Sequence, residues 1–500
     1  MFRWLSGLFA LLLTGVADAE TYHVAVNGVD VADRNGLTEA MAWASLAFAC
    51  EQVSEGTHTI RLGAGTFTAQ RTAKLKSGWT VVGAGRDPAT GTVIVADKKW
   101  ELVTKFNKEV PENEFMIAMK KVKDIHLSAL VIVSPTDRHL TGGIFCMDGE
   151  NIELTELYVH DFRWAGMMLN HSRKLNVHHN LIENASSTKM QHHGGLIRTT
   201  WIKESEIHHN RILATVGEGY GYKGGGHEAV RFHHNHVEVA GEFAFESAHE
   251  NEFGLEIDHN YLNRCCSVPK GGQGADPNSR GHAYSVWLHH NIMTDSYTVE
   301  GPRNHLRLSH NYIRIEKTGG RVYTQHGGKN KGPVWIHHNV IEKLDRAFVW
   351  MNEGLAEDIQ VFNNTVFCAD AGDRTGAIFG AYSGERLNNW VVKNNIFVAP
   401  MEKPRALFPT QRGVNDKIKA SGNVVINMTD VPDGNQVGQL SWLSGSGERP
   451  WPFFASVEPN TNLIDAGVDQ GQPFHGIAPD IGAFEHGLTK PFPVVGPDAP

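Results

Sequence analysis

The stretch Leu175-Asn176-Val177-His178-His179-Asn180-Leu181-Ile182 decides the fold, because its pattern returns along most of the chain. The tripeptide His-His-Asn occurs at 178–180, 208–210, 233–235, 289–291 and 337–339, and related copies end in Asn260, Asn311, Asn364, Asn395 and Asn423. Successive asparagines are 20 to 31 residues apart. A period in this range indicates a repeat architecture in which each repeat stacks on the next.

Short alternating runs flank each asparagine. Pro333–Ile336 comes shortly before Asn339, and Val340-Ile341 follows it. Alternation with a period of two is typical of a strand, so each repeat should hold a strand, a tight turn at Asn, a second strand, a variable loop and a third strand. One such repeat cannot bury its apolar face alone, whereas stacked repeats can. The sequence therefore predicts an all-β fold, a parallel β-helix of about 12 coils.

The repeated asparagine is interpreted as structural. At the same turn of successive coils, each side-chain amide can bond to the next, and Asn tolerates the left-handed backbone that such turns need. Upstream, Ala129 and Glu156 are expected in the same frame as Asn180. The paired histidines are interpreted as a stack of imidazoles and not as a metal centre, because metal sites use few ligands in a closed shell.

The ends of the chain differ from its repeats. Arg3, the apolar run Leu5–Val16 and Ala17-Asp18-Ala19 match a secretory signal peptide, so we expect cleavage near Ala19 and a secreted or periplasmic protein. An uncleaved anchor helix is the alternative. Thr38–Val53 has apolar residues at helical spacing and is expected to form a capping helix. We expect 1–19 to be the signal peptide, 20–115 the cap and first coils, 116–430 the β-helix with its groove, and 431–500 a last coil, cap and Pro-rich tail.

The composition excludes some classes of protein. The chain of 500 residues has 46 Lys+Arg and 55 Asp+Glu, a formal net charge of −9, which argues against nucleic acid as a partner. With 41% hydrophobic and 20% charged residues, the balance is that of a globular protein. Outside the N-terminal segment, no stretch approaches the ~18 consecutive apolar residues of a membrane span.

The chain resembles the secreted right-handed parallel β-helix proteins of the pectate-lyase-like superfamily. Besides the asparagine ladder, the motifs are the opening Tyr22–Gly28, the coil start Leu62–Phe67 and the closing Asp480–Glu485. The resemblance covers nearly all of the mature chain. It implies a right-handed parallel β-helix that acts on carbohydrate, so we expect a monomer whose partner is a polysaccharide. Members include polysaccharide lyases, glycoside hydrolases, epimerases, adhesins and tail spikes, so the fold alone does not choose a reaction.

In enzymes of this superfamily the substrate usually lies along the outer side of the first strand of each coil. In this chain most of these strands begin apolar and end polar, and neighbouring coils lie ~4.8 Å apart. Their polar ends are expected to form a column made of Asn170, Arg198, Lys223, Glu246, Lys270, Glu300, His326 and Asn352. Loops rich in Gly and charged residues follow these strands and supply His249, Glu250, Arg280, His282, Arg303 and His305, with Tyr323 nearby. Such a cluster on a rigid scaffold favours function over a solvated ion-pair face.

Elimination from a uronic-acid polymer needs a cation on the sugar carboxylate, a base for the neighbouring proton and an acid for the leaving oxygen. Lys223 or Lys270 is the candidate base, and Arg280, Arg303, His305 or Tyr323 the candidate acid. Arg198, His249, His282, His326 and Asn352 are candidate substrate contacts. Glu246, Glu250 and Glu300 could hold a hard cation such as Ca²⁺. The resemblance implies a Lys base, an Arg and acidic residues around calcium, but no Asn–Glu–x–Glu cluster is clear.

Two alternatives remain. An inverting glycoside hydrolase would need two carboxyl groups at ~6.5–9.5 Å, and Glu246 and Glu300 are expected two coils apart. Lys270 between them would depress both pKa values, which is unfavourable for an acid. A non-catalytic glycan binder would need only aromatic platforms and hydrogen bonds along the groove, and the candidate platforms are Trp164, Trp201, Trp287, Trp335, Trp350 and Trp390. The mixed charges of the cluster favour an enzyme, and a lyase on an acidic glycan is the first hypothesis.

Overall fold

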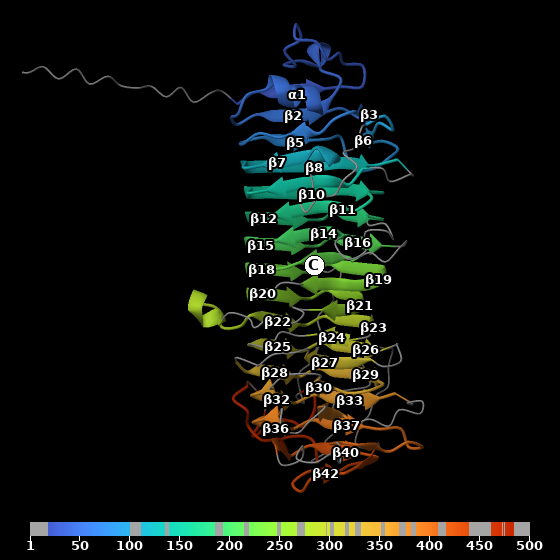
Figure 1. Ribbon diagram of the computed structural model, residues 1–500, viewed down its shortest axis with the longest axis vertical. Helices are drawn as coiled ribbons and strands as arrows, with labels where there is room; N and C mark the ends of the chain where they lie inside the picture. Colours follow the sequence, from blue (N-terminus) through green and yellow to red (C-terminus); the bar gives the residue numbers. More distant parts are fainter. Residues whose placement is uncertain are drawn as a thin grey trace, which may run out of the picture.

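The fold is a parallel β-solenoid. The computed structural model describes residues 19–100, 112–135, 140–185, 194–214, 220–247, 252–267, 276–296, 298–300, 305–315, 320–325, 332–351, 356–369, 377–381, 387–408, 417–439, 462–472, 474 and 476–484. Within them, 38 strands join in one continuous sheet that winds into a tall stack (Figure 1). The predicted all-β parallel β-helix is confirmed, and its count of about ten turns differs slightly from the 12 or so expected.

The continuous sheet has three faces, each a stack of parallel strands. The first face consists of the strands that precede the asparagine turn. These are β1 (Thr21–Val24), β2 (Thr59–Leu62), β5 (Thr80–Val82), the first halves of β8 (Lys123–Val133) and β10 (Glu150–His160), β12 (Arg173–His178), β15 (Lys203–His208), β18 (Glu228–His233), β20 (Phe253–Asp258), β22 (Val286–His289), β25 (Leu306–Ser309), β28 (Val334–His337), β32 (Ile359–Phe362), β36 (Trp390–Lys393) and β39 (Ile418–Ser421).

The second face follows the asparagine turn. It holds β3 (Gly65–Ala69), β6 (Thr92–Ala96), the second halves of β8 and β10, β13 (Leu181–Glu183), β16 (Arg211–Ala214), the first halves of β19 (His236–Ser247) and β21 (Tyr261–Ser267), β23 (Ile292–Ser296), β26 (Tyr312–Ile315), β29 (Val340–Leu344), β33 (Thr365–Cys368), β37 (Ile396–Val398), β40 (Val424–Ile426) and β42 (Gln436–Val437).

The third face completes each coil and carries the candidate site. It holds β4 (Ala73–Lys74), β7 (Phe115–Lys120), β9 (Gly142–Met147), β11 (Ala165–Asn170), β14 (Gly195–Thr200), β17 (Tyr222–Gly224), the second halves of β19 and β21, β24 (Thr298–Glu300), β27 (Arg321–Gln325), β30 (Val349–Met351) and β34 (Phe379–Ala381). Two further pairs form separate two-stranded sheets, β31 (Ala356–Glu357) with β35 (Leu387–Asn388) and β38 (Arg405–Ala406) with β41 (Met428–Thr429).

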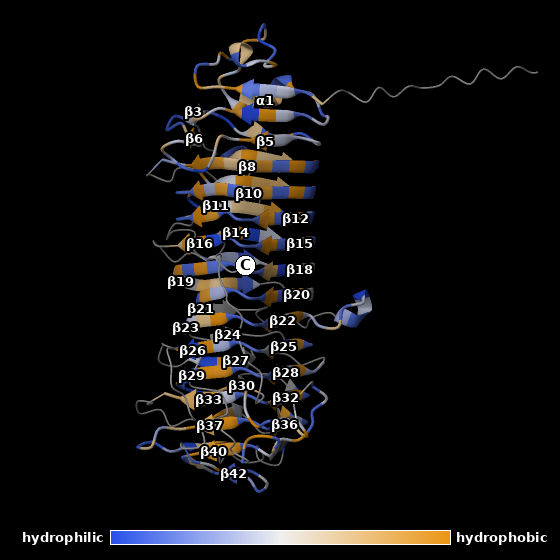
Figure 2. Cartoon of the chain, turned by 180° about the vertical axis from the view of Figure 1, so that it is seen from behind, coloured by the Kyte–Doolittle hydropathy of each residue, from blue (hydrophilic) through white to orange (hydrophobic). Residues whose placement is uncertain are grey.

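The core runs the length of the stack because every strand alternates between inside and outside. In β12, Leu175 and Val177 are buried, whereas Asn176 and His178 keep partial exposure. The same alternation puts hydrophilic and hydrophobic residues side by side along the strands (Figure 2). Each coil stacks the apolar inner positions of one strand on those of the next, so the core is built from the repeat itself.

The predicted asparagine ladder is confirmed. Each side-chain Nδ2 donates to the Oδ1 of the next asparagine at 2.7–3.1 Å, from Asn180 to Asn423. The ladder extends one step beyond the predicted set, to Asn435. The left-handed position was predicted wrongly by one residue. The residue before Asn takes it, as at His179 with φ 55°, and both Ala129 and Glu156 align with His179 and not with Asn180.

The paired histidines form two stacks of rings along the same turn, as interpreted from the sequence. Ring centroids in successive coils lie 4.8–5.2 Å apart, for example between His209 and His234. Within a coil the two Nδ1 atoms lie 2.7–2.9 Å apart, so one must donate its proton to the other. Burial, with the neighbouring rings second, lowers the pKa of His290 to about 3, and burial lowers that of His338 to about 4. We call this element the imidazole stack.

The N-terminal end carries the expected capping helix, which is shorter than predicted. The α-helix α1 (Leu46–Gln52) is capped at its N-terminus by Ser45, whose side chain accepts from the Phe48 amide. Residues 39–41 form the short 3-10 helix η1 (Glu39–Met41), and two more 3-10 helices are η2 (Glu112–Glu114) and η4 (Pro277–Arg280). The buried side of α1 includes Leu46 and Cys50, which join the solenoid core and cover its first rungs.

Candidate active site

Three charged side chains lie one above another on the outer side of the third face. The register aligns Arg198 of β14 with Lys223 of β17, and Lys223 with Glu246 of β19. The residue before each of them is at most 1% exposed and belongs to the core, so strand alternation turns the charged residue outward. We call Arg198, Lys223 and Glu246 the charged column. The core neighbours are Ile197, Tyr222 and Phe245.

Lys223 and Glu246 form a nearly dehydrated ion pair. The Lys223 Nζ lies 2.6 Å from Glu246 Oε2, and the two side chains are only 10% and 6% exposed. The ammonium also lies 3.7 Å from the centre of the Tyr220 ring, which favours the charged lysine through a cation–π contact. Taking two charges out of water costs several kcal/mol per ion, so burial of this pair on the outer side of the sheet is energetically unfavourable by itself.

Arg198 continues the column toward the N-terminal end and meets an aromatic side chain. Its guanidinium lies 4.9 Å from the centre of the Trp164 ring. Burial lowers the pKa of Arg198, while Glu246 acts in the opposite direction. The next two rungs in register are Met168 and Phe145, which pack with Trp164 in an apolar cluster separate from the solenoid core. The column therefore borders an apolar patch on the same outer face.

A buried polar network lies directly beneath the column. Glu252 accepts from the His227 backbone amide and ring Nδ1, both at 2.8 Å, and also from Ser247 Oγ. His227 Nε2 lies 2.9 Å from both Thr199 Oγ1 and Tyr222 OH. All five side chains are at most 2% exposed, so every polar group must find a protein partner.

This inner network positions the outer column. Thr199 follows Arg198, Tyr222 precedes Lys223 and Ser247 follows Glu246 in the chain. Each inward neighbour is held by a hydrogen bond, which fixes the rung that presents its charged residue outward. Sequence reasoning missed this network. The sequence pattern that could have indicated it is the presence of polar residues at inward positions of strands. The pairing of His227 with Glu252 could not be predicted, because only the stacking of coils brings them together.

The predicted column is correct at four rungs and wrong elsewhere. The register runs from Glu246 through Ser267 to Glu300, which places the two glutamates two rungs apart as expected. The next aligned residues are Thr324 and Trp350, so these positions and Ser267 replace the predicted His326, Asn352 and Lys270. Asn170 aligns with Thr200 and not with Arg198. The number of residues between the asparagine and the third-face strand varies from coil to coil, so these four positions were predicted two or three residues away from the true ones.

The structure contradicts the prediction that Tyr323 is an acid of the reaction. Its side chain is fully buried and belongs to the solenoid core, where it aligns with Val349. The alternation of β27 turns Thr324 outward in its place. Tyr323 therefore cannot donate a proton to a substrate on the outer face.

Arg280, His282 and His305 lie at the corner between the third and first faces. Arg280 pairs with Glu228 and covers the Phe253 ring at 4.1 Å. The His282 ring packs against Gly254, where a Cβ would lie 2.5 Å from its Nδ1. His305 Nε2 lies 3.8 Å from Asp276, and burial lowers the pKa of His305. None of these contacts includes Lys223 or Glu246, so the roles of the three residues remain predictions.

The remaining candidates lie outside the described residues. These are Lys270, Arg303, His249, Glu250, His326 and Asn352, and for Glu300 only the backbone is described. Their roles stay predictions.

The predicted calcium site stays a prediction, because Glu246 is the one of its three carboxylates whose side chain the structure describes. Ca²⁺ takes six to eight oxygen ligands, and Glu246 supplies the one described carboxylate of the three proposed. Its Oε2 is already in contact with the Lys223 ammonium. A cation at this oxygen would have to displace the lysine.

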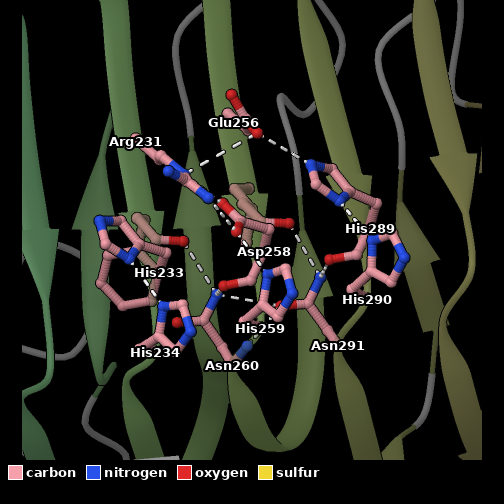
Figure 3. A network of polar contacts seen from close by, with 12 residues as sticks. Arg231, His233, His234, Glu256, Asp258, His259, Asn260, His289, His290 and Asn291 are labelled. Carbon is pink, nitrogen blue, oxygen red and sulfur yellow. Dashed lines mark hydrogen bonds and ion pairs between the residues drawn. The ribbon is translucent and has the colours of Figure 1, made fainter. Parts of the chain in front are cut away.

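A second polar cluster lies on the first face, beside the imidazole stack (Figure 3). Among the described residues, Glu256, Asp258 and His289 have ligand atoms within 4.8 Å of one another. Arg231 already binds both oxygens of Asp258, at 2.8 and 2.6 Å, and His289 Nε2 lies 3.0 Å from Glu256. Burial opposes ionisation, but the bonds from Arg231 and His259 hold the pKa of Asp258 well below its usual range. The guanidinium thus supplies the positive charge that a metal would bring, and the cluster is structural.

No family model and no curated protein sequence matches the chain. Similar solved structures include the pectate lyase Pel9A, at 15% identity over 94% of this chain and 97% of that one, with a TM-score of 0.30. Others are the Agl-KA catalytic domain (14%, 80% and 68%, TM-score 0.40) and the GH136 lacto-N-biosidase from Eubacterium ramulus (11%, 81% and 68%, TM-score 0.37). The likeness goes no further than the β-solenoid fold. No helix in the described part of the chain has the length and apolar character to cross a membrane.

Proposed function

We propose that the protein is an extracellular enzyme that cleaves an acidic, uronate-containing polysaccharide by β-elimination at the charged column. The observation that carries the proposal is the nearly dehydrated Lys223–Glu246 pair next to Arg198 on the outer side of the third face. A guanidinium, an ammonium and a carboxylate in three adjacent rungs are the groups that elimination requires. A surface that only binds glycans has no need for opposed charges at such a desolvation cost.

The geometry favours a revised division of roles. Arg198 would neutralise the sugar carboxylate, which makes the adjacent C–H acidic. Because Lys223 rests as an ammonium against Glu246, the available base is Glu246 and the available acid is Lys223. Glu246 would take the proton from carbon, the C–O bond to the leaving sugar would break, and Lys223 would protonate the leaving oxygen. Transfer of the proton from Glu246 back to Lys223 across the 2.6 Å contact restores the resting pair.

Hydrolysis is the second candidate, and one observation favours it. Glu246 and Glu300 share the outer column with one rung between them, which corresponds to about 10 Å between Cα positions. That spacing is close to the ~6.5–9.5 Å of an inverting pair of carboxyl groups. In this reading Lys223 would hold Glu246 ionised as the base, and Glu300 would be the acid.

Export belongs to the proposal, because polysaccharides of this kind are extracellular. The signal peptide predicted for residues 1–19 lies almost wholly outside the described residues. Expression of the full chain in a secreting host, followed by N-terminal sequencing of the exported protein, tests it. A first residue near Glu20 supports export, and an intact Met1 on a retained protein contradicts it.

The reaction is tested by ultraviolet absorbance of unsaturated uronates. Mature protein is incubated with a panel of acidic polysaccharides, with added calcium in one series and a chelator in another. A rise with one polymer supports elimination, and its loss with chelator would assign calcium a role. A rise in reducing ends without absorbance supports hydrolysis. No product by either assay contradicts an enzyme of this class.

A further inference from the structure

A large cavity lies at the N-terminal end of the solenoid, between α1 and the rungs of β4 and β7. Its volume is about 1060 Å³, which is ample for more than one sugar residue. Ala47, Leu75 and Val122 give it apolar walls, and Trp100 contributes an aromatic ring. The cavity is four rungs away from the charged column and shares no residue with it.

The cavity is cationic in a protein that is acidic overall. Among the described residues that line it, three carry carboxylates, namely Glu51, Glu55 and Asp97. They face twice as many cationic side chains, namely Arg71, Lys74, Lys76, Lys99, Lys120 and Lys121. The formal net charge of the whole chain is −9, so the excess of positive charge is local. A concave site lined by one sign of charge attracts ligands of the other sign.

Some of these cations are engaged within the protein and others are not. Arg71 pairs with Glu51 at 2.9 Å, and Lys74 and Lys120 share Glu112 at 2.6 and 3.8 Å. The Lys76 ammonium donates to the Val53 carbonyl. In the described part of the chain, no carboxylate lies within 4.0 Å of the Lys99 or Lys121 ammonium, and neither has a partner of this kind. These two ammonium groups are therefore the ones that can bind an anion without breaking an existing ion pair.

The cavity and the charged column lie along one line of the third face. The register leads from Lys74 through Ala118, Phe145 and Met168 to Arg198. Four rung spacings of ~4.8 Å make this distance about 19 Å. The intervening rungs carry the apolar patch around Trp164. A polymer laid along the outer face would thus meet cations at both ends and apolar side chains between them.

We infer that this cavity is a distal binding site for the acidic glycan, which holds uronate carboxylates through Lys99 and Lys121 while the same chain reaches the charged column. The inference rests on the proposed function for the identity of its ligand. A uronate oligosaccharide fits better than a small anion, because the cavity combines cations with an aromatic ring and apolar walls over a volume far larger than one ion needs.

The test is calorimetric binding and does not require turnover. Oligogalacturonate and oligomannuronate are the acidic probes, and maltotetraose is the neutral one. The variant Lys99→Glu/Lys121→Glu should weaken binding of an acidic probe on the order of tenfold or more and should flatten its salt dependence. The matched control is Lys98→Glu, since Lys98 is exposed and adjacent but does not line the cavity.

Three results would overturn the inference: equal binding by the double variant, an equal loss in Lys98→Glu, or binding of neither acidic probe to the native protein. The proposed function fails separately, when no polymer is cleaved. If the native protein cleaves no polymer but binds oligouronate, and the double variant loses that binding, then the cavity site is supported and the proposed reaction is contradicted. Unchanged folding of the variants is verified by circular dichroism.

Discussion

At the scale of single residues, the Lys223–Glu246 pair depends on both of its members. Each charge is nearly excluded from water and is compensated by the other at 2.6 Å. Lys203 and Glu228, on the first face, form a pair at 2.9 Å with side chains 50% and 25% exposed. The same two residue types therefore occur in a buried and an exposed setting, which makes the exposed pair a natural control.

We predict that Lys223→Met destabilises the protein by about 3–5 kcal/mol, because it leaves the Glu246 carboxylate buried without a partner. Lys203→Met should cost less than about 1 kcal/mol. The free energy of unfolding in urea measures both. The double variant Lys223→Met/Glu246→Leu should recover most of the loss, and a double variant as unstable as Lys223→Met would contradict this account of the pair.

At the scale of elements, the asparagine ladder stabilises the turn of every coil. The Asn260 amide donates to Phe232 O, Asp258 O and Asn291 Oδ1, all at 2.9–3.0 Å, and its Oδ1 accepts from Asn235. These groups are buried, so removing the side chain leaves several of them without a hydrogen-bond partner. Asn435 at the end of the ladder is only partly buried.

Asn260→Ala should therefore lower the free energy of unfolding by several kcal/mol, at about 1–3 kcal/mol for each buried group left without a partner. Asn435→Ala should cost about 1 kcal/mol, since water can replace its bonds. Urea unfolding of the two variants gives the comparison. Equal losses would show that the ladder does not work through buried hydrogen bonds.

The imidazole stack makes stability depend on pH. A histidine in the unfolded chain has a pKa near 6.5, whereas burial lowers that of His310 to about 3. Below pH 6.5 the unfolded chain thus binds more protons than the folded one, and the free energy of unfolding falls as the pH decreases toward 3. His310→Asn should reduce this slope by up to about 1.4 kcal/mol per pH unit.

Asparagine suits this position because Asn363 and Asn394 occupy it in later coils, with the same positive φ. Urea titrations of the native and His310→Asn proteins at intervals from pH 7 to pH 4 measure the slope. Identical slopes would contradict the assignment of acid sensitivity to the stack.

The comparison of sequence with structure also belongs to this scale. The asparagine ladder could be predicted because each step is local and self-repeating: Asn180 bonds to Asn210 as Asn210 bonds to Asn235. The register of the third face could not, because loops of variable length separate it from the asparagine turn. Lys270 was therefore placed where Ser267 lies.

At the scale of the whole molecule, the solenoid turns a repeat into a long outer face. Stacking places the cationic cavity, the apolar patch and the charged column in one line on the third face. The inner network around His227 and Glu252 holds the rungs beneath that column. Substrate binding along a rigid face needs little reorganisation of the protein, which is the physical advantage of this scaffold.

The most direct test of the central claim is the initial rate of unsaturated-uronate absorbance for Glu246→Gln against Lys203→Met. On a polymer that the native protein cleaves, Glu246→Gln should lose a factor on the order of 100 to 10,000, the usual contribution of a general base. Lys203→Met should retain the native rate. A folded Glu246→Gln protein that cleaves at the native rate would contradict the charged column as the reacting centre.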